Sequence, residues 1–376
     1  MMKKNFPLSV IIVSLSFLSF STSFALPEYL EGSELQTHPK LTQGTLDNGV
    51  TYFLLPNEKP ESKISLRLYV GAGSMDEVAD QQGVAHFLEH MLFDGSKTFQ
   101  PGEMIPHLQN MGMTFGQHVN AYTGFDRTVY MLDLPDTEDE TLDTCFNILH
   151  DYVNGALLDA DELEKERGVI LAEKISRDSI SRRLFTQKIN LLMPESMLPK
   201  RFPIGIEEVI KNIPRQRMVD FYENYYSSHN IAVVAVGDLE PEKMESLVKK
   251  HFSNIPEKHP KRNQNYGQVP ALDKAHYKVL FDGELDRTSI DFTNVQPYQY
   301  QIENKENAAQ ALTYALINQI ITTRLQEIAE QEGSPIISGY AYQDILANHA
   351  RYNTISVSTS PELWTCLLYT SDAADD

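Results

Sequence analysis

The chain has almost no cysteine. Its 376 residues include two, Cys145 and Cys366. Residues 366–376 resemble a translated sequencing adapter, so we expect the native sequence to stop near Thr365 and exclude this stretch from the fold. With one cysteine left, an internal disulfide is excluded. Cys145 lies in an apolar helical pattern, and we therefore expect a core residue rather than a nucleophile.

Basic residues are also scarce. The chain has 32 Lys and Arg against 52 Asp and Glu, which gives a net charge of −20 at pH 7. A chain this acidic repels phosphate groups, and this argues against a nucleic-acid partner.

Long apolar runs are missing after the first 25 residues. Lys3 and Lys4 precede an apolar stretch over residues 6–20, and Ala25 ends a small-residue cleavage pattern. We predict a signal peptide over residues 1–25, cleaved after Ala25, and export to the periplasm or the medium. The alternative is a membrane anchor, but the run is shorter than the ~20 residues that a spanning helix needs. No stable membrane anchor is therefore expected.

Strand and helix patterns alternate along the remaining chain, which predicts an α+β fold with antiparallel sheets flanked by helices. We predict a catalytic domain over residues 35–256 and a polar, turn-rich linker over 257–270. Residues 271–365 are expected to form a second domain of the same fold, truncated and therefore incomplete.

The sequence His86-Phe-Leu-Glu89-His90 lies in a predicted helix over residues 81–93. Residues four apart share a helix face, so His86 and His90 can bind one metal ion together. Zinc suits such a site because it accepts nitrogen and carboxylate ligands and lowers the pKa of a bound water toward ~7. Glu89 is then placed to act as general base on that water. The pattern H-x-x-E-H is the inverted-zincin signature.

A catalytic zinc needs a third protein ligand. The long predicted helix that begins at Asp161 carries four glutamates, and the residues alone do not choose among them. They are Glu162, Glu164, Glu166 and Glu173. Glu166 and Glu173 are seven apart and share a face. Glu162 and Glu164 fit a solvated helix start, with Asp161 and Glu164 as a capping box.

Together, the blocks at residues 86–93 and 166–173 resemble the insulinase/pitrilysin family, which includes mitochondrial processing peptidase. The resemblance implies that Glu173 is the third zinc ligand and that Glu166 supports the site. It also implies a clamshell of two halves that encloses unfolded peptides. We therefore expect one zinc ion per chain, a peptide or unfolded-protein substrate, and a missing C-terminal half or partner subunit.

A third block, Gly116–Thr123, resembles the edge strand of the same family. By that resemblance, Asn120 and Ala121 line the cleft, and a substrate peptide pairs with the strand backbone. His118 is interpreted as a strand surface residue. His229 lies in a helix-to-strand connection, and we assign it a structural role.

The leading hypothesis is a zinc endopeptidase in which Glu89 activates a zinc-bound water. The alternative is a non-catalytic structural or partner subunit of the same fold, but such relatives usually lose the metal motif. A zinc-storage protein is a third hypothesis, and storage has no need of a general base at Glu89.

Overall fold

The computed structural model describes residues 9–14, 35, 37–262, 265–271, 274–285, 287–301 and 304–367. The chain divides into two compact units. Unit 2 comprises residues 37–176 and 200–265. Unit 1 comprises residues 177–199 and 266–376 together with residues 1–36.

Unit 2 contains a six-stranded sheet in the order β2-β3-β7-β4-β6-β5. Its strands are β2 (Thr42–Thr45), β3 (Thr51–Pro56), β4 (Ile64–Val70), β5 (Val119–Thr123), β6 (Thr128–Leu134) and β7 (Ile231–Gly237). All neighbours are antiparallel except β3 and β7. The order places β5 at one edge of the sheet, where one side of its backbone pairs with no other strand that the structure describes.

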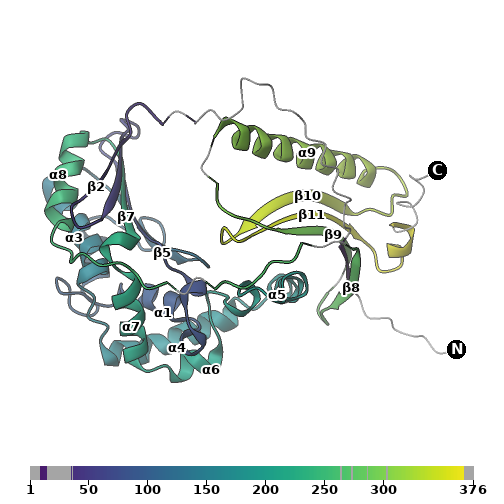
Figure 1. Ribbon diagram of the computed structural model, residues 1–376, viewed down its shortest axis with the longest axis horizontal. Helices are drawn as coiled ribbons and strands as arrows, with labels where there is room; N and C mark the ends of the chain where they lie inside the picture. The colour runs from purple at the N-terminus through teal and green to yellow at the C-terminus, as the bar shows by residue number, and fades with distance from the viewer. Residues whose placement is uncertain are drawn as a thin grey trace. The chain divides into compact units, whose positions relative to one another are not determined.

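Helices pack on this sheet and close one large apolar core (Figure 1). They are α1 (Val84–Met91), α2 (Met104–Asn110), α3 (Asp139–Asn154), α4 (Ala160–Ser176), α6 (Glu207–Asn212), α7 (Arg215–Tyr225) and α8 (Pro241–Phe252). Strand β4 shows how one face of the sheet packs on this core. Its residues alternate between buried and less buried positions, so every second side chain points into the core. Cys145 on α3 is fully buried, as expected, and burial raises the pKa of its thiol to about 12.

Unit 1 contains a five-stranded sheet in the order β10-β11-β9-β1-β8. Its strands are β1 (Ser9–Ser14), β8 (His276–Phe281), β9 (Thr288–Pro297), β10 (Ser338–Leu346) and β11 (Ala350–Thr359). Strand β1 pairs with β8 antiparallel and with β9 parallel. It falls within the predicted signal peptide, which stays a prediction. The other described pairs, β10 with β11 and β11 with β9, are antiparallel.

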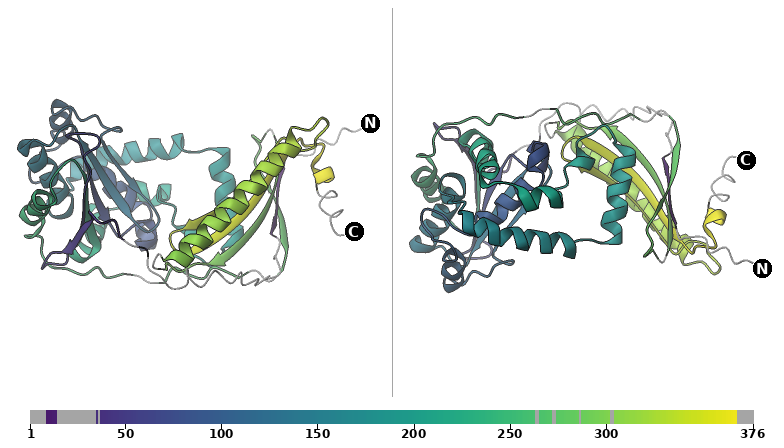
Figure 2. Two further views of the ribbon diagram at one scale, coloured as in Figure 1. Left: turned by 90° about the horizontal axis from the view of Figure 1, so that it is seen from above. Right: turned by 90° about the horizontal axis from the view of Figure 1, so that it is seen from below.

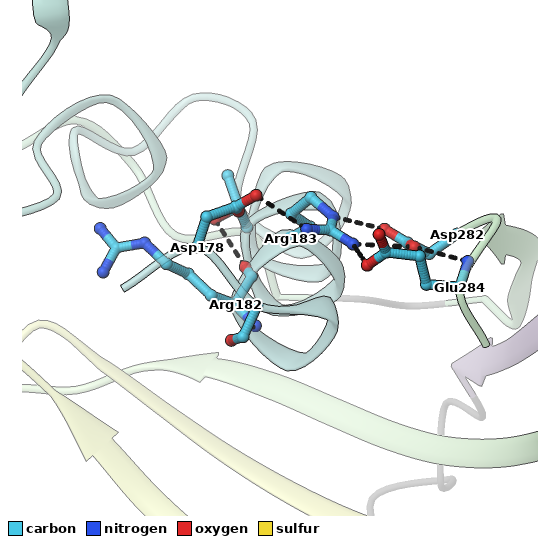
Figure 3. A network of polar contacts seen from close by, with 7 residues as sticks. Asp178, Arg182, Arg183, Asp282 and Glu284 are labelled. Carbon is cyan, nitrogen blue, oxygen red and sulfur yellow. Dashed lines mark hydrogen bonds and ion pairs between the residues drawn. The ribbon is translucent and has the colours of Figure 1, made fainter. Parts of the chain in front are cut away.

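Two helices, α5 (Ile180–Leu192) and α9 (Lys305–Ala329), lie on opposite faces of this sheet (Figure 2). Lys188 of α5 is buried, and its Nζ lies 3.0 Å from Asp291 Oδ2 on β9. Arg183, one turn earlier, binds Asp282 at 2.6 Å and Glu284 at 2.7 Å just after β8 (Figure 3). These charged contacts add to the apolar packing of α5, whose Ile189 and Leu192 are buried and whose Leu184 packs against Leu280 of β8.

The α+β prediction is confirmed, although each sheet also contains one parallel pair. The predicted capping box at the start of α4 is wrong, because Asp159 accepts from the backbone N–H groups of Asp161 and Glu162 instead. The domain boundaries that we predicted remain predictions. Helix α5, which groups with unit 1, had no counterpart among the predicted elements. Among the described residues, no helix has the length and apolar character that crossing a bilayer requires.

Candidate active site

Helix α1 carries the metal-binding motif and is almost wholly buried. Gly83 precedes it with a φ of +101°, which glycine adopts without strain. A Cβ at this position would lie 3.0 Å from the Cα of Gly205, which is a tight contact. Buried Glu77 accepts hydrogen bonds from the backbone N–H groups of Gly83 and Ala85, both at 2.9 Å. These bonds satisfy N–H groups that the first turn of a helix leaves without partners.

The two histidines of α1 meet one carboxylate from α4. The Nε2 atoms of His86 and His90 lie 3.4 Å and 3.5 Å from the same Oε2 atom of Glu173. A tetrahedral zinc ion with bonds of about 2.0–2.2 Å holds its ligand atoms roughly 3.3–3.6 Å apart. The donor set and its spacing therefore fit a zinc ion bound by His86, His90 and Glu173.

Helix α4 reaches this position because its inner face mixes two kinds of residue. Leu163 and Ile170 are buried, and Glu166 and Glu173 follow each of them by three residues. Positions three, four and seven apart share a helix face, so the two apolar residues anchor α4 while the two glutamates point along the same side. Helices α1 and α4 pack against each other (Figure 1).

Glu166 contacts the ring of His90 and orients it. Its Oε1 lies 2.7 Å from His90 Nδ1. This contact leaves Nε2 of His90 facing Glu173, which is the arrangement that supporting carboxylates impose on metal-binding histidines. Burial lowers the pKa of His90, but the bond to Glu166 and the charges of Glu89 and Glu173 raise it by more, so the net shift is upward.

The side chain of Glu89 is buried beside the two histidines and is held by a hydroxyl group. Thr123 Oγ1, at the end of β5, donates to Glu89 Oε2 at 2.6 Å. Thr123 thus fixes one carboxylate oxygen of Glu89.

The phenols of Tyr130 and Tyr226 form a buried hydrogen bond of 2.7 Å in the same core. Burial raises the pKa of both tyrosines, so they stay neutral.

Of the other two glutamates of α4, Glu164 is exposed and Glu162 is half-buried. Glu162 pairs with Lys165 at 2.6 Å, and Glu164 pairs with Arg167 at 2.7 Å. Glu164 is solvated, as interpreted, whereas Glu162 is half-buried and its charge acts on Asp94. Sequence reasoning missed Thr123, although it ends the same block as Asn120 and Ala121. The only available signal was its position at the end of that block.

Sequence reasoning also missed Asp94, which follows α1. Burial and the charges of Glu166 and Glu162 raise its pKa to about 6.

Asn120 and Ala121 lie on the edge strand β5. Asn120 is exposed, and its Oδ1 accepts from the backbone N–H of Ala121 at 2.9 Å. The strand begins at Val119 rather than at the start of the Gly116–Thr123 block, because residues 114–118 form a tight turn. His118 precedes the strand, and its Nδ1 accepts from the backbone of Thr114 at 3.1 Å.

Two family models match the chain. The model for insulinase, peptidase family M16, matches residues 52–189, and the model for the M16 inactive domain matches residues 212–371. The first match contains His86, Glu89, His90 and Glu173. The chain belongs to the insulinase family of peptidases, family M16.

Individual relatives of this M16 chain carry protease names. The probable zinc protease PqqL of Escherichia coli is 28% identical over 333 residues, which is 88% of this chain and 36% of the relative. The probable zinc protease PqqL of Haemophilus influenzae is 31% identical over 81% of this chain and 32% of its own length. The crystal structure of the periplasmic protease PqqL from Escherichia coli matches 87% of this chain and 36% of its own, with a TM-score of 0.78 and 27% identity. The chain therefore spans about a third of the length of these relatives.

Proposed function

We propose that this M16 chain carries the catalytic site of a zinc-dependent endopeptidase. The observation that supports this most is the position of one Glu173 oxygen, 3.4 Å and 3.5 Å from the Nε2 atoms of two histidines on one helix turn. One catalytic zinc ion per chain would be held by His86, His90 and Glu173. The relatives named zinc proteases support the metal and the reaction class.

The bound zinc would polarise the scissile carbonyl and lower the pKa of a water molecule beside it. Glu89 is the group on this chain that takes the proton of the attacking water and passes it to the leaving amine. Thr123 holds Oε2 of Glu89 by a 2.6 Å bond, which fixes the position of the carboxylate. Glu166 keeps the His90 ring turned toward Glu173.

The substrate would be a peptide or a small unfolded protein bound along β5. An edge strand offers backbone N–H and C=O groups that an extended peptide can pair with. Strand β5 ends at Thr123, the residue that contacts Glu89, so a peptide on this strand would run toward the general base. Asn120 and Ala121 would lie along its path.

We further propose export to the periplasm and a requirement for a second half. The predicted leader supports export, and so does the description of the structural relative as a periplasmic protease. Relatives about three times as long support further polypeptide, in the same chain or as a partner subunit, that completes the substrate chamber.

The test measures zinc and hydrolysis together. We expect the purified protein to contain tightly bound zinc by elemental analysis and Glu173→Gln to lose most of it. Where the protein cleaves an unfolded peptide, alone or with its complementing half, Glu89→Gln should keep the zinc and lose at least ~10²-fold in kcat. Unchanged hydrolysis by Glu89→Gln would exclude this mechanism. A zinc-loaded wild type that cleaves no peptide even with the complementing half would favour a non-catalytic subunit.

A further inference from the structure

A second group of metal-binding side chains lies on the surface of unit 2. His229 belongs to the short helix η5 (Ser228–Asn230), and Glu257 and His259 follow α8. One ligand atom from each lies within 4.8 Å of the others. His229 Nε2 lies 3.2 Å from Glu257 Oε1, and the rings of His229 and His259 stack with centroids 3.7 Å apart. None of these residues takes part in the proposed peptidase site.

The position of His229 is set by a glycine. Gly49, in the hairpin turn between β2 and β3, has a φ of +95°. A Cβ added there would lie 2.4–2.5 Å from three atoms of the His229 ring. The ring therefore rests directly on the backbone of the turn, in space that any other residue at position 49 would fill.

The segment that carries Glu257 and His259 is held next to η5 by backbone bonds. Lys258 N–H donates to Ser228 Oγ at 3.0 Å, and its carbonyl accepts from His229 N–H at 3.3 Å. Further along, Asn224 and Lys261 exchange two hydrogen bonds of 2.9 Å and 3.0 Å. The fold thus brings together the backbone segments that carry the three ligands before any ion binds, and this reduces the entropy cost of forming a site.

We propose that His229, Glu257 and His259 form a second, surface site for a divalent transition-metal ion. Two imidazoles and one carboxylate suit Zn²⁺, Cu²⁺ and Ni²⁺. Because stacked rings direct their lone pairs along nearly parallel planes, binding requires the exposed His259 ring to turn out of the stack. The bound ion cross-links residues 257–259 to η5. In the sequence, this segment shortly precedes Asn265, where the chain leaves unit 2.

The test is a zinc titration of the metal-free full chain by calorimetry, with bound zinc counted after dialysis. We expect two binding events in the wild-type protein, the weaker of which is the surface site. His229→Ala and His259→Ala should each remove the weaker event or weaken it at least 10-fold. His38→Ala, which changes another exposed histidine outside both groups, should keep both events.

Glu173→Gln separates this proposal from the peptidase proposal, because it should disturb the tight event and leave the weaker one in place. A weaker event that persists in His259→Ala overturns the surface site, and so does a wild-type protein that shows the tight event alone. Far-ultraviolet circular dichroism should be unchanged in all three histidine variants, since each replaced side chain is exposed.

Discussion

The two histidine–glutamate groups of unit 2 differ in what surrounds them. In the first, His86 is buried, and His90 and Glu173 are partly buried. A further carboxylate orients His90, and the helix that carries both histidines begins on a buried acceptor, Glu77. In the second group all three residues are exposed. One ring rests on a glycine, and the remaining support is backbone bonding.

Under the two proposals, this difference separates a metal site that can support peptide hydrolysis from one that can only bind a metal ion. A buried site excludes bulk water and strengthens the electrostatic effect of each fixed charge. It also holds the proposed general base, Glu89, whose position is fixed by Thr123. The surface group has no such additional carboxylate among the three residues that define it. Its metal would be held more weakly and would have no catalytic partner.

The largest effect that sharpens this comparison comes from the orienting carboxylate. Glu166→Gln keeps the shape of the side chain but removes its charge next to His90. Loss of such a supporting carboxylate typically weakens metal affinity 10–100-fold. We expect that loss at the buried site, measured by competition with a zinc chelator, and no change at the surface site. Equal affinity in Glu166→Gln and wild type would show that Glu166 does not orient the ligand.

A smaller effect is expected from the hydroxyl group that holds the general base. Thr123→Val removes the 2.6 Å bond to Glu89 and leaves a side chain of similar size. A hydrogen bond to a charged group contributes about 1.5–3 kcal/mol, which corresponds to roughly 10–100-fold in rate if all of it acts in the transition state. We expect kcat to fall by about 10-fold, the lower end of this range, while zinc content and KM stay unchanged. Thr123→Ser, which restores the hydroxyl, should recover most of the rate.

The sequence predicted the buried site better than the surface one for a physical reason. His86, Glu89 and His90 lie within one helix turn, so their spacing alone brings them together. Glu173 needed the family resemblance, because four glutamates share α4 and only the packing of Leu163 and Ile170 decides which face α1.

The residues of the surface group are distant in sequence. His229 and Glu257 are 28 residues apart, and nothing in their local pattern indicates that α8 returns the chain to η5. For the same reason, the contact of Thr123 with Glu89 was not predicted. The α+β class was predictable from strand and helix periodicity. The parallel pairing of β3 with β7 was not, since these two strands lie far apart in the sequence.

The last effect concerns the pH dependence of stability and depends on the burial of Glu77. Burial raises the pKa of Glu77 to about 8, although the N–H groups of Gly83 and Ala85 and the charge of Arg201 oppose the shift. Between the ordinary carboxyl pKa and about 8, the folded protein therefore keeps a proton that the unfolded chain has released. Stability must then fall as pH rises through this window, by at most ~1.4 kcal/mol per pH unit from this group.

Glu77→Gln should remove that slope. The amide has one acceptor oxygen in place of two, so the variant is less stable than wild type at pH 5, but its free energy of unfolding should change less between pH 5 and pH 8. Urea unfolding at four pH values measures both quantities. Glu257→Gln is the matched control, because an exposed carboxyl in the surface group should leave the slope as it is. If the wild-type slope persists in Glu77→Gln, Glu77 is ionised in the folded protein, and α1 then begins on a buried charge.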